Sequence, residues 1–350
     1  MKNSELTAGA AWMKGSIIPL KDAALPLNDW GLTRSDITYD VVPVIDGAFF
    51  RLDDYLDRFE ASMTDMRLDP KLTRVEIKTA LTEMVSATGL RSSYVSMVCS
   101  RGVPNVAGSR NPKDCENHFF AWCVPYVNII NPDIAKNGAS AWISETVKRI
   151  PEDSVNPKNK NYHWGDLTKG LFEAKDNEAE TVILVDHQDN ITEGPGFNVF
   201  AVIKGKIVTS DHGVLEGISR KTILDICDEL SIPTETRSLT KIEFMEADEI
   251  FLTTSSGGVV PITQVNDRIF SNNAPGEMSN KLKDCYWVWS QKEELRTEIT
   301  YKEQKVITKS TAKNSITKTF NKIIWATFFI AIILILYVIY TEYPELIGLK

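Results

Sequence analysis

The chain has 350 residues, 43% hydrophobic and 25% charged, and these globular values exclude a wholly disordered or collagen-like chain. The formal net charge is −8, but residues 301–350 hold seven Lys and three Glu (+4), so residues 1–300 carry −12. Such an acidic body predicts no nucleic-acid partner, because phosphate contacts need clustered cations. Five Cys without a C-x-x-C pair and four His without metal-ligand spacing predict neither a disulfide framework nor a metal site.

The first part of the chain, residues 1–147, predicts a small α+β lobe with a mainly antiparallel sheet. Residues 53–68 carry apolar side chains at helical spacing. Thr73 and Glu76 form a capping-box signature at the start of a second helix. Strands are predicted from apolar runs at residues 37–45, 48–51, 94–99 and 119–127.

A polar stretch rich in Pro and Asn, residues 148–165, reads as a connector. Residues 166–300 predict a larger α/β lobe, in which Ser219 is expected to cap a helix. The strands of this lobe are predicted at residues 181–186, 197–203, 206–209 and 249–254. Its helices are predicted at residues 167–175, 219–230 and 279–291.

The C-terminal part predicts a membrane anchor. Residues 323–340 run for 18 residues without a charge and have aromatic residues near both edges, which fits a transmembrane helix. Six lysines precede it in a basic linker, residues 301–322, and by the positive-inside tendency the body would lie in the cytoplasm. A buried core helix and a plain soluble spacer are the alternatives.

Two glycine-containing turns lie close after predicted strands, at residues 215–220 and 254–258. Glycine lets backbone N–H groups approach a ligand, and the N-terminus of a following helix favours an anion. Together the two turns could form a phosphate-binding cup. Neither is a Walker loop or a dinucleotide fingerprint, so ordinary turn chemistry remains the alternative.

Four segments resemble, in the same order, the motifs of fold-type IV pyridoxal-phosphate (PLP) aminotransferases, the class IV superfamily of branched-chain and D-amino-acid aminotransferases. They are FRLD at 50–53 followed by Arg58, NKNYHWGDL at 159–167, ITEGPGFN at 191–198 and LEGISR at 215–220. The (R)-selective amine transaminases look closest, on residues 35–41, 149–151 and 164–167. The resemblance implies a D-amino-acid aminotransferase-like fold, PLP in a cleft between two lobes, and a homodimer.

The resemblance implies that Lys160 bonds to the cofactor aldehyde and, once released, moves a proton as general base and acid. A lysine in a partly dry site loses its proton more easily, as this chemistry requires. A surface lysine in a linker is the alternative for Lys160. If the register of the motif were shifted, Lys158 would be the candidate.

The resemblance also implies the residues that hold the cofactor. Glu193 would face the pyridine nitrogen, and Arg58 would clamp the phosphate unless it merely pairs with Asp54 one turn earlier. Backbone N–H groups at the turn of residues 215–220 and one hydroxyl from the turn of residues 254–258 would complete the phosphate cup, and an apolar side chain would wall the ring. These further cofactor-binding residues are Ile218, Ser219, Ser255 and Leu215.

The substrate pocket is implied less fully. Tyr39, Trp164 and Ser256 would line it. The related amine transaminases carry a carboxylate-binding arginine on the loop after residue 102, where Arg101 and Arg110 are the nearest candidates here. The chain also departs from the first-helix motif, with tyrosine at position 55 where histidine is common.

These implications predict transfer of an amino group between a primary amine or amino acid and a 2-keto acid, of the (R)-amine:pyruvate type. The alternatives are a branched-chain or D-amino-acid aminotransferase, and a PLP lyase of the aminodeoxychorismate lyase type. A membrane-anchored scaffold that keeps the fold without catalysis is the alternative outside enzymes.

Overall fold

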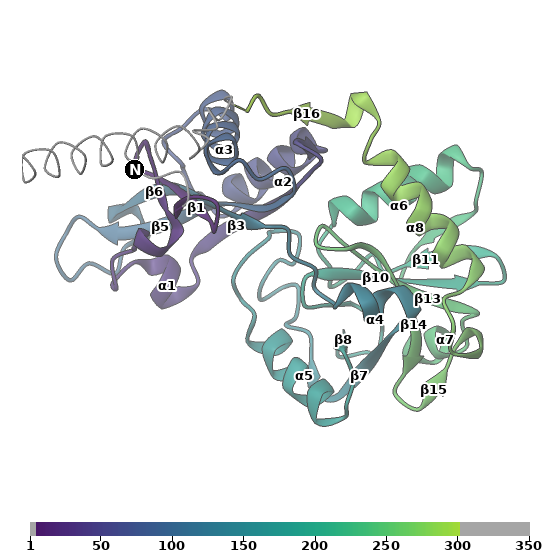
Figure 1. The fold of residues 1–350 in the computed structure, drawn as a ribbon. Helices are drawn as coiled ribbons and strands as arrows, with labels where there is room; N and C mark the ends of the chain where they lie inside the picture. Colours follow the sequence, from purple (N-terminus) through teal and green to yellow (C-terminus); the bar gives the residue numbers. More distant parts are fainter. Residues whose placement is uncertain (1–4, 302–350) are drawn as a thin grey trace, which may run out of the picture. The chain divides into compact units, whose positions relative to one another are not determined.

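The computed structural model describes residues 5–301, whose strands form two sheets (Figure 1). Every neighbouring pair of strands in the first sheet is antiparallel, as expected for the N-terminal part. Its strands follow the order β16 (Arg296–Glu298), β4 (Ala48–Phe50), β3 (Ile37–Ile45), β5 (Ser93–Pro104), β6 (Cys115–Pro125), β1 (Ala10–Met13) and β2 (Ser16–Pro19).

Two helices pack against the first sheet: α2 (Leu52–Asp65) contacts β3, and α3 (Arg74–Thr88) contacts β1, β5 and β6. The predicted capping box is confirmed, because the Thr73 side chain accepts from the Glu76 N–H while the Glu76 carboxylate accepts from the Thr73 N–H. The shorter elements of this part are α1 (Trp30–Arg34), η2 (Leu20–Asp22) and η3 (Pro112–Asp114).

The second sheet is mixed, with parallel pairs β11/β12, β14/β7 and β7/β8. Its strands follow the order β12 (Thr234–Thr236), β11 (Lys206–Thr209), β10 (Phe197–Ile203), β13 (Glu249–Thr254), β14 (Gly258–Val265), β7 (Ala139–Lys148) and β8 (Thr181–Val185). Two short strands lie beside this path, β9 (Glu193–Gly194) on β10 and β15 (Arg268–Ile269) on β14.

Helices cover both faces of the second sheet because its strands are apolar on both faces. On β10, Val199 packs in the cluster that contains Phe244 of α7, whereas Phe200 packs with Ile226 of α6 and Tyr286 of α8. The helices of this part are α4 (Pro132–Asn137), α5 (Gly165–Asp176), α6 (Ile218–Glu229), α7 (Lys241–Met245), α8 (Glu277–Trp289), η4 (Ser271–Asn273) and η5 (Glu293–Leu295).

Several predicted elements need correction. The N-cap of α6 is Gly217, and Ser219 lies inside the helix, where its hydroxyl contacts the Tyr286 hydroxyl. The predicted strands do not include β1, β2, β7, β9, β12, β14, β15 or β16. Strand β7 belongs to the second sheet, so the change of sheet lies before β7, whereas the predicted boundary at 147/148 lies at its end. The division into two lobes remains a prediction.

The expected membrane anchor is also corrected. Within residues 5–301, none of the helices has the length and apolar character needed to cross a bilayer. The transmembrane helix assigned to the fold, and the tail-anchored location drawn from it, are therefore wrong for the structure as described. The sequences on which they rested, the basic linker from residue 302 onward and residues 323–340, lie outside the described residues.

Candidate active site

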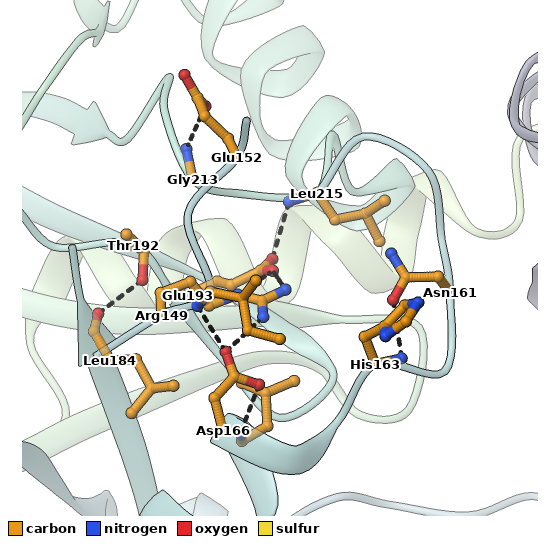
Figure 2. A network of polar contacts seen from close by, with 12 residues as sticks. Arg149, Glu152, Asn161, His163, Asp166, Leu184, Thr192, Glu193, Gly213 and Leu215 are labelled. Carbon is orange, nitrogen blue, oxygen red and sulfur yellow. Dashed lines mark hydrogen bonds and ion pairs between the residues drawn. The ribbon is translucent and has the colours of Figure 1, made fainter. Parts of the chain in front are cut away.

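The segment that carries Lys160 lies between β7 and α5 and is held by β3 of the other sheet. The Lys160 carbonyl accepts hydrogen bonds from the Thr38 hydroxyl at 2.8 Å and from the Tyr39 N–H at 3.1 Å. Asn161 forms an isolated bridge with Thr38, and its side chain accepts from the His163 N–H at 2.9 Å (Figure 2). Hydrogen bonds from β3 and within the segment itself thus fix the backbone on both sides of Lys160.

The Lys160 amine points into a cavity and lies 4.7 Å from the centre of the Tyr39 ring. Burial, followed by the positive charge of Arg58, lowers the pKa of Lys160 to about 8. Lys158 differs, because it is exposed and pairs with Glu216 at 2.8 Å. Of the two candidate lysines, only Lys160 lines this cavity.

Glu193 closes one end of the cavity as a buried carboxylate, where β9 begins. One of its oxygens accepts from Arg149 at 3.0 Å and the other from the Leu215 N–H at 2.9 Å (Figure 2). Arg149 also pairs with Asp166 at 2.7 Å, so it sits between two carboxylates. Burial raises the pKa of Glu193, and the charge of Arg149 opposes that rise.

A second part of the cavity lining, the anion-binding end, carries donor groups that suit an anion. The first N–H groups of α6, at Ile218 and Ser219, have no partner within the helix and suit an anion. Gly217 precedes them, and a Cβ there would lie 2.1 Å from the Asn198 side-chain oxygen, so glycine allows this close approach. The Ser255 side chain also lines the cavity.

Arg58 projects from α2 toward this end with a side chain only 10% exposed. Its Nε and Nη2 donate to both oxygens of the buried Asp40, at 2.9 and 2.6 Å, and its Nη1 donates to the Glu216 carbonyl at 3.0 Å. The alternative pairing with Asp54 does not occur, since Asp54 pairs with Arg51 and Lys221 instead. Arg58 is therefore fixed in place while two of its five N–H groups stay available.

One cavity thus brings together most of the residues singled out from the sequence. They are Tyr39, Arg58, Lys160, Trp164, Glu193, Leu215, Ile218, Ser219 and Ser255. An anion-binding end, a buried lysine and a buried carboxylate fit the phosphate, the aldehyde and the basic ring nitrogen of PLP. The donor set therefore suits this cofactor.

An adjoining part of the cavity is apolar. Beyond Lys160, its described lining contains no other charged side chain. The Tyr94 and Trp122 rings stack at 5.4 Å, and the Tyr39 and Tyr162 rings lie 4.4 Å apart. The other lining residues are Val41, Val124, Val127, Ile129, Trp164, Pro195, Gly196, Thr254, Ser255 and Ser256.

The two candidate arginines for a substrate carboxylate lie elsewhere. The Arg101 guanidinium pairs with Asp36 at 2.9 Å and donates to the carbonyls of Met66 and Arg67. Arg110 is exposed on the loop between β5 and β6, and neither arginine lines the cavity in this chain. Sequence reasoning quoted Arg149 and Asp166 as motif residues but gave them no role. Their contacts join segments far apart in the sequence.

The sequence pattern of the family Amino-transferase class IV matches residues 38–265. The chain belongs to the class IV aminotransferases. It is 27% identical over 278 residues to a putative branched-chain-amino-acid aminotransferase of Methanocaldococcus jannaschii, covering 79% of this chain and 94% of the relative. It is 25% identical over 277 residues to a D-alanine aminotransferase of Bacillus licheniformis, covering 77% and 93%.

The fold is that of solved aminotransferases. The branched-chain amino acid aminotransferase of Thermobaculum terrenum, solved in its PLP form, matches with a TM-score of 0.72 and 24% identity, covering 83% of this chain and 98% of that one. Another branched-chain amino acid aminotransferase, solved with pyridoxamine 5'-phosphate, matches with a TM-score of 0.77 and 23% identity, covering 84% and 99%. The family membership and these matches confirm the predicted aminotransferase family and its PLP cofactor. The class IV aminotransferase described here is therefore a PLP-dependent enzyme.

Proposed function

We propose that this aminotransferase moves an amino group from a primary amine, or from an amino acid with an apolar side chain, to a 2-keto acid, in a reaction of the (R)-amine:pyruvate type. The observation that carries the proposal is one arrangement. A buried lysine shares one cavity with anion-binding groups and a buried carboxylate, and it also lines an adjoining apolar, aromatic part of that cavity. Lys160 is the proposed catalytic residue.

The bound cofactor supplies an electron sink for the electron pair left when a proton leaves the substrate carbon. Arg58 holds the phosphate with its two available N–H groups, together with the N–H groups of Ile218 and Ser219 and the Ser255 hydroxyl. Glu193 would keep a proton on the ring nitrogen through Oε2, which has one lone pair beyond its bond from the Leu215 N–H. Its other oxygen, Oε1, already accepts from both Nε and Nη2 of Arg149, at 3.3 and 3.0 Å. Leu215 walls the ring.

Lys160 moves the proton. A lysine amine can accept a proton only when it is neutral, and a pKa of about 8 leaves a useful neutral fraction near pH 7 to 8. Its Nζ takes the proton from the substrate carbon that bears the amino group and later returns a proton. The bonds from Thr38 and Tyr39 to its carbonyl keep the side chain aimed into the cavity.

The apolar part of the cavity supports the choice of amino donor. Tyr39 and Trp164 present ring surface beside Lys160, and burying an aromatic or aliphatic substituent there is favourable. A donor with a second carboxylate, such as glutamate, would leave that charge without a cation other than Lys160 among the described residues that line the apolar part.

The carboxylate of the keto acid is less defined. Because Arg101 is already paired with Asp36, Arg110 remains the candidate for binding that group. The proposal includes a homodimer whose partner chain completes the site, as the family resemblance implies.

A branched-chain or D-amino-acid aminotransferase is the second candidate. The names of the relatives from Methanocaldococcus jannaschii and Bacillus licheniformis favour it. An aliphatic side chain would also fit an apolar cavity, so geometry alone separates the two candidates poorly. One extra methylene in such a pocket changes discrimination by only about 1–3 kcal/mol.

A single-turnover experiment separates the candidates. The PLP-loaded enzyme is mixed with (R)-1-phenylethylamine, its (S) enantiomer, L-leucine, D-alanine or L-glutamate, and the pyridoxamine phosphate formed is measured by chromatography. The proposal expects product from the (R)-amine, little from glutamate, none with Lys160→Ala and normal amounts with Lys158→Ala. Product from leucine or D-alanine alone would replace it with the second candidate. Turnover without pyridoxamine phosphate would indicate a lyase.

A further inference from the structure

Two buried tyrosine hydroxyls lie directly behind the serines of the anion-binding end. Tyr55 of α2 is 0% exposed, and its hydroxyl lies 2.6 Å from the Ser255 hydroxyl. Tyr286 of α8 is 1% exposed, and its hydroxyl lies 3.0 Å from the Ser219 hydroxyl. Both serines line the cavity, whereas neither tyrosine does. Each serine thus contacts a phenol on the side away from the cavity.

The Tyr55 contact limits the freedom of the Ser255 side chain. A serine side chain lacks the methyl group that restricts threonine at χ1, so its hydroxyl can take three staggered positions. The Tyr55 hydroxyl, 2.6 Å away, is a partner on one side of the serine and limits that rotation. The phenol of Tyr55 therefore supplies an orientation that serine lacks by itself.

The direction of the hydrogen bonds follows from the groups nearby. Burial raises the pKa of Tyr55 to about 12, so its phenol keeps its proton at neutral pH. When that phenol donates to the Ser255 oxygen, the serine proton is free to donate into the cavity. The backbone at Ser255 is fixed separately, since the Tyr126 hydroxyl donates to the Ser255 carbonyl at 3.0 Å and accepts from the Gly257 N–H at 3.0 Å.

The serine hydroxyls are important for binding an anion here, because most N–H groups of Arg58 already donate hydrogen bonds within the protein. Three of its N–H groups already donate to Asp40 and to the Glu216 carbonyl. The buried Asp40 also offsets its charge at close range. A phosphate at this end would therefore depend strongly on hydroxyl and backbone donors. Fixing those donors in advance avoids the entropy cost of ordering them on binding.

We infer that Tyr55 and Tyr286 are positioning residues for the cofactor phosphate, and that they hold the hydroxyls of Ser255 and Ser219 as donors toward it. The inference rests on the proposed function, because it takes this end of the cavity as the phosphate site. It predicts that the phenols influence ligands that carry a phosphate and have little influence on ligands that lack one.

The test compares pyridoxamine 5'-phosphate with pyridoxamine, because neither bonds covalently to Lys160. Dissociation constants are measured on the full chain, without other cofactor, by quenching of protein fluorescence. Tyr55→Phe keeps the ring and removes only the hydroxyl. We expect it to weaken pyridoxamine 5'-phosphate binding about five- to tenfold, the usual effect of one neutral hydrogen bond, and to change pyridoxamine binding less than about twofold.

A double-mutant cycle tests the connection through the serine. In a Ser255→Ala background the phenol of Tyr55 has lost its partner at 2.6 Å, so Tyr55→Phe should have a much smaller further effect. Tyr286→Phe should behave in the same way with Ser219→Ala. Tyr301→Phe is the matched control, since its phenol donates to the Leu90 carbonyl at 2.7 Å away from the cavity, and it should leave both constants unchanged.

The outcomes separate this inference from the proposed function. If the unaltered chain does not prefer pyridoxamine 5'-phosphate over pyridoxamine, the phosphate site is wrong and both fall. If it does prefer it, but Tyr55→Phe and Tyr286→Phe bind it normally, only the inference is overturned. The inference is also overturned if the two tyrosine substitutions weaken the binding of both ligands equally. It is overturned as well if their effects on binding free energy add fully to those of the serine substitutions. Thermal melting of each variant shows whether its fold is intact.

Discussion

Replacing Arg149 by Met would leave two buried carboxylates without their shared cation. Arg149 pairs with Glu193 at 3.0 Å and with Asp166 at 2.7 Å. The side chains of Arg149, Glu193 and Asp166 are 9%, 8% and 7% exposed, so water cannot replace the lost partner. Removing one member of a buried ion pair costs about 3–5 kcal/mol, because the other charge stays buried and unpaired. We expect a loss of stability of that size.

The assay is urea unfolding of the cofactor-free protein at pH 7, read as the change in unfolding free energy. Arg237→Met is the matched control, because Arg237 also pairs with two carboxylates, Glu235 and Glu243, but its side chain is 37% exposed. Exposed ion pairs contribute little, so the control should lose far less.

A relief variant strengthens this test. Adding Glu193→Gln and Asp166→Asn to Arg149→Met removes the two stranded charges, and part of the lost stability should return. If Arg149→Met costs no more than Arg237→Met, or if neutralising the two carboxylates recovers nothing, then Arg149 does not hold Glu193 through charge pairing. The electrostatic reasoning about this end of the cavity would be refuted.

Three further predictions concern other charged side chains. In cofactor-free protein, the unfolding free energy of the unaltered chain minus that of Lys160→Met should rise from about pH 8 to the ordinary lysine pKa. In that range the unfolded chain binds more protons than the folded chain. A difference that does not change with pH would contradict the lowered pKa of Lys160. Burial alone would raise the pKa of Glu173, but hydrogen-bond donors led by the Ser144 hydroxyl lower it to about 2. Glu173→Gln should therefore lower the unfolding free energy by its full amount above pH 4.5, and this loss should fade as the pH falls toward 2. A loss that persists at pH 2 would contradict the lowered pKa. Asp40→Asn should destabilise the cofactor-free protein by about 3–5 kcal/mol, because it leaves the buried Arg58 charge without its partner. Adding pyridoxamine 5'-phosphate should restore part of the lost stability in thermal melts. A variant that melts like the unaltered chain would argue against this pairing.

Local patterns in the sequence predicted much of the fold because the forces behind them are local. The capping box at Thr73 and Glu76 needs only four consecutive residues, and the helix begins where the pattern places it. The strands predicted at residues 37–45 and 48–51 likewise appear as β3 and β4, joined through Asp46 and Gly47, which both have positive φ. The family motifs also led to residues that the fold brings into one cavity.

Contacts between distant segments could not be read in this way. Ser219 looked like a helix cap, but its hydroxyl contacts Tyr286, 67 residues further along the chain. Tyr55 and Ser255 meet across 200 residues. Strand β7 has no local signal for its sheet, because its neighbours β8 and β14 are chosen by tertiary packing. The roles of such residues depend on which residues the fold places beside them, and a short sequence pattern does not contain that information.

The most direct test of the account is to locate the lysine that binds the cofactor. The full chain is loaded with PLP, reduced with borohydride and digested, and the peptides are examined by mass spectrometry. We predict that the phosphopyridoxyl group is found on Lys160 and that Lys160→Ala carries none at that segment. Label on Lys158 instead, or no label in the unaltered chain, would contradict the assignment of this cavity as the active site.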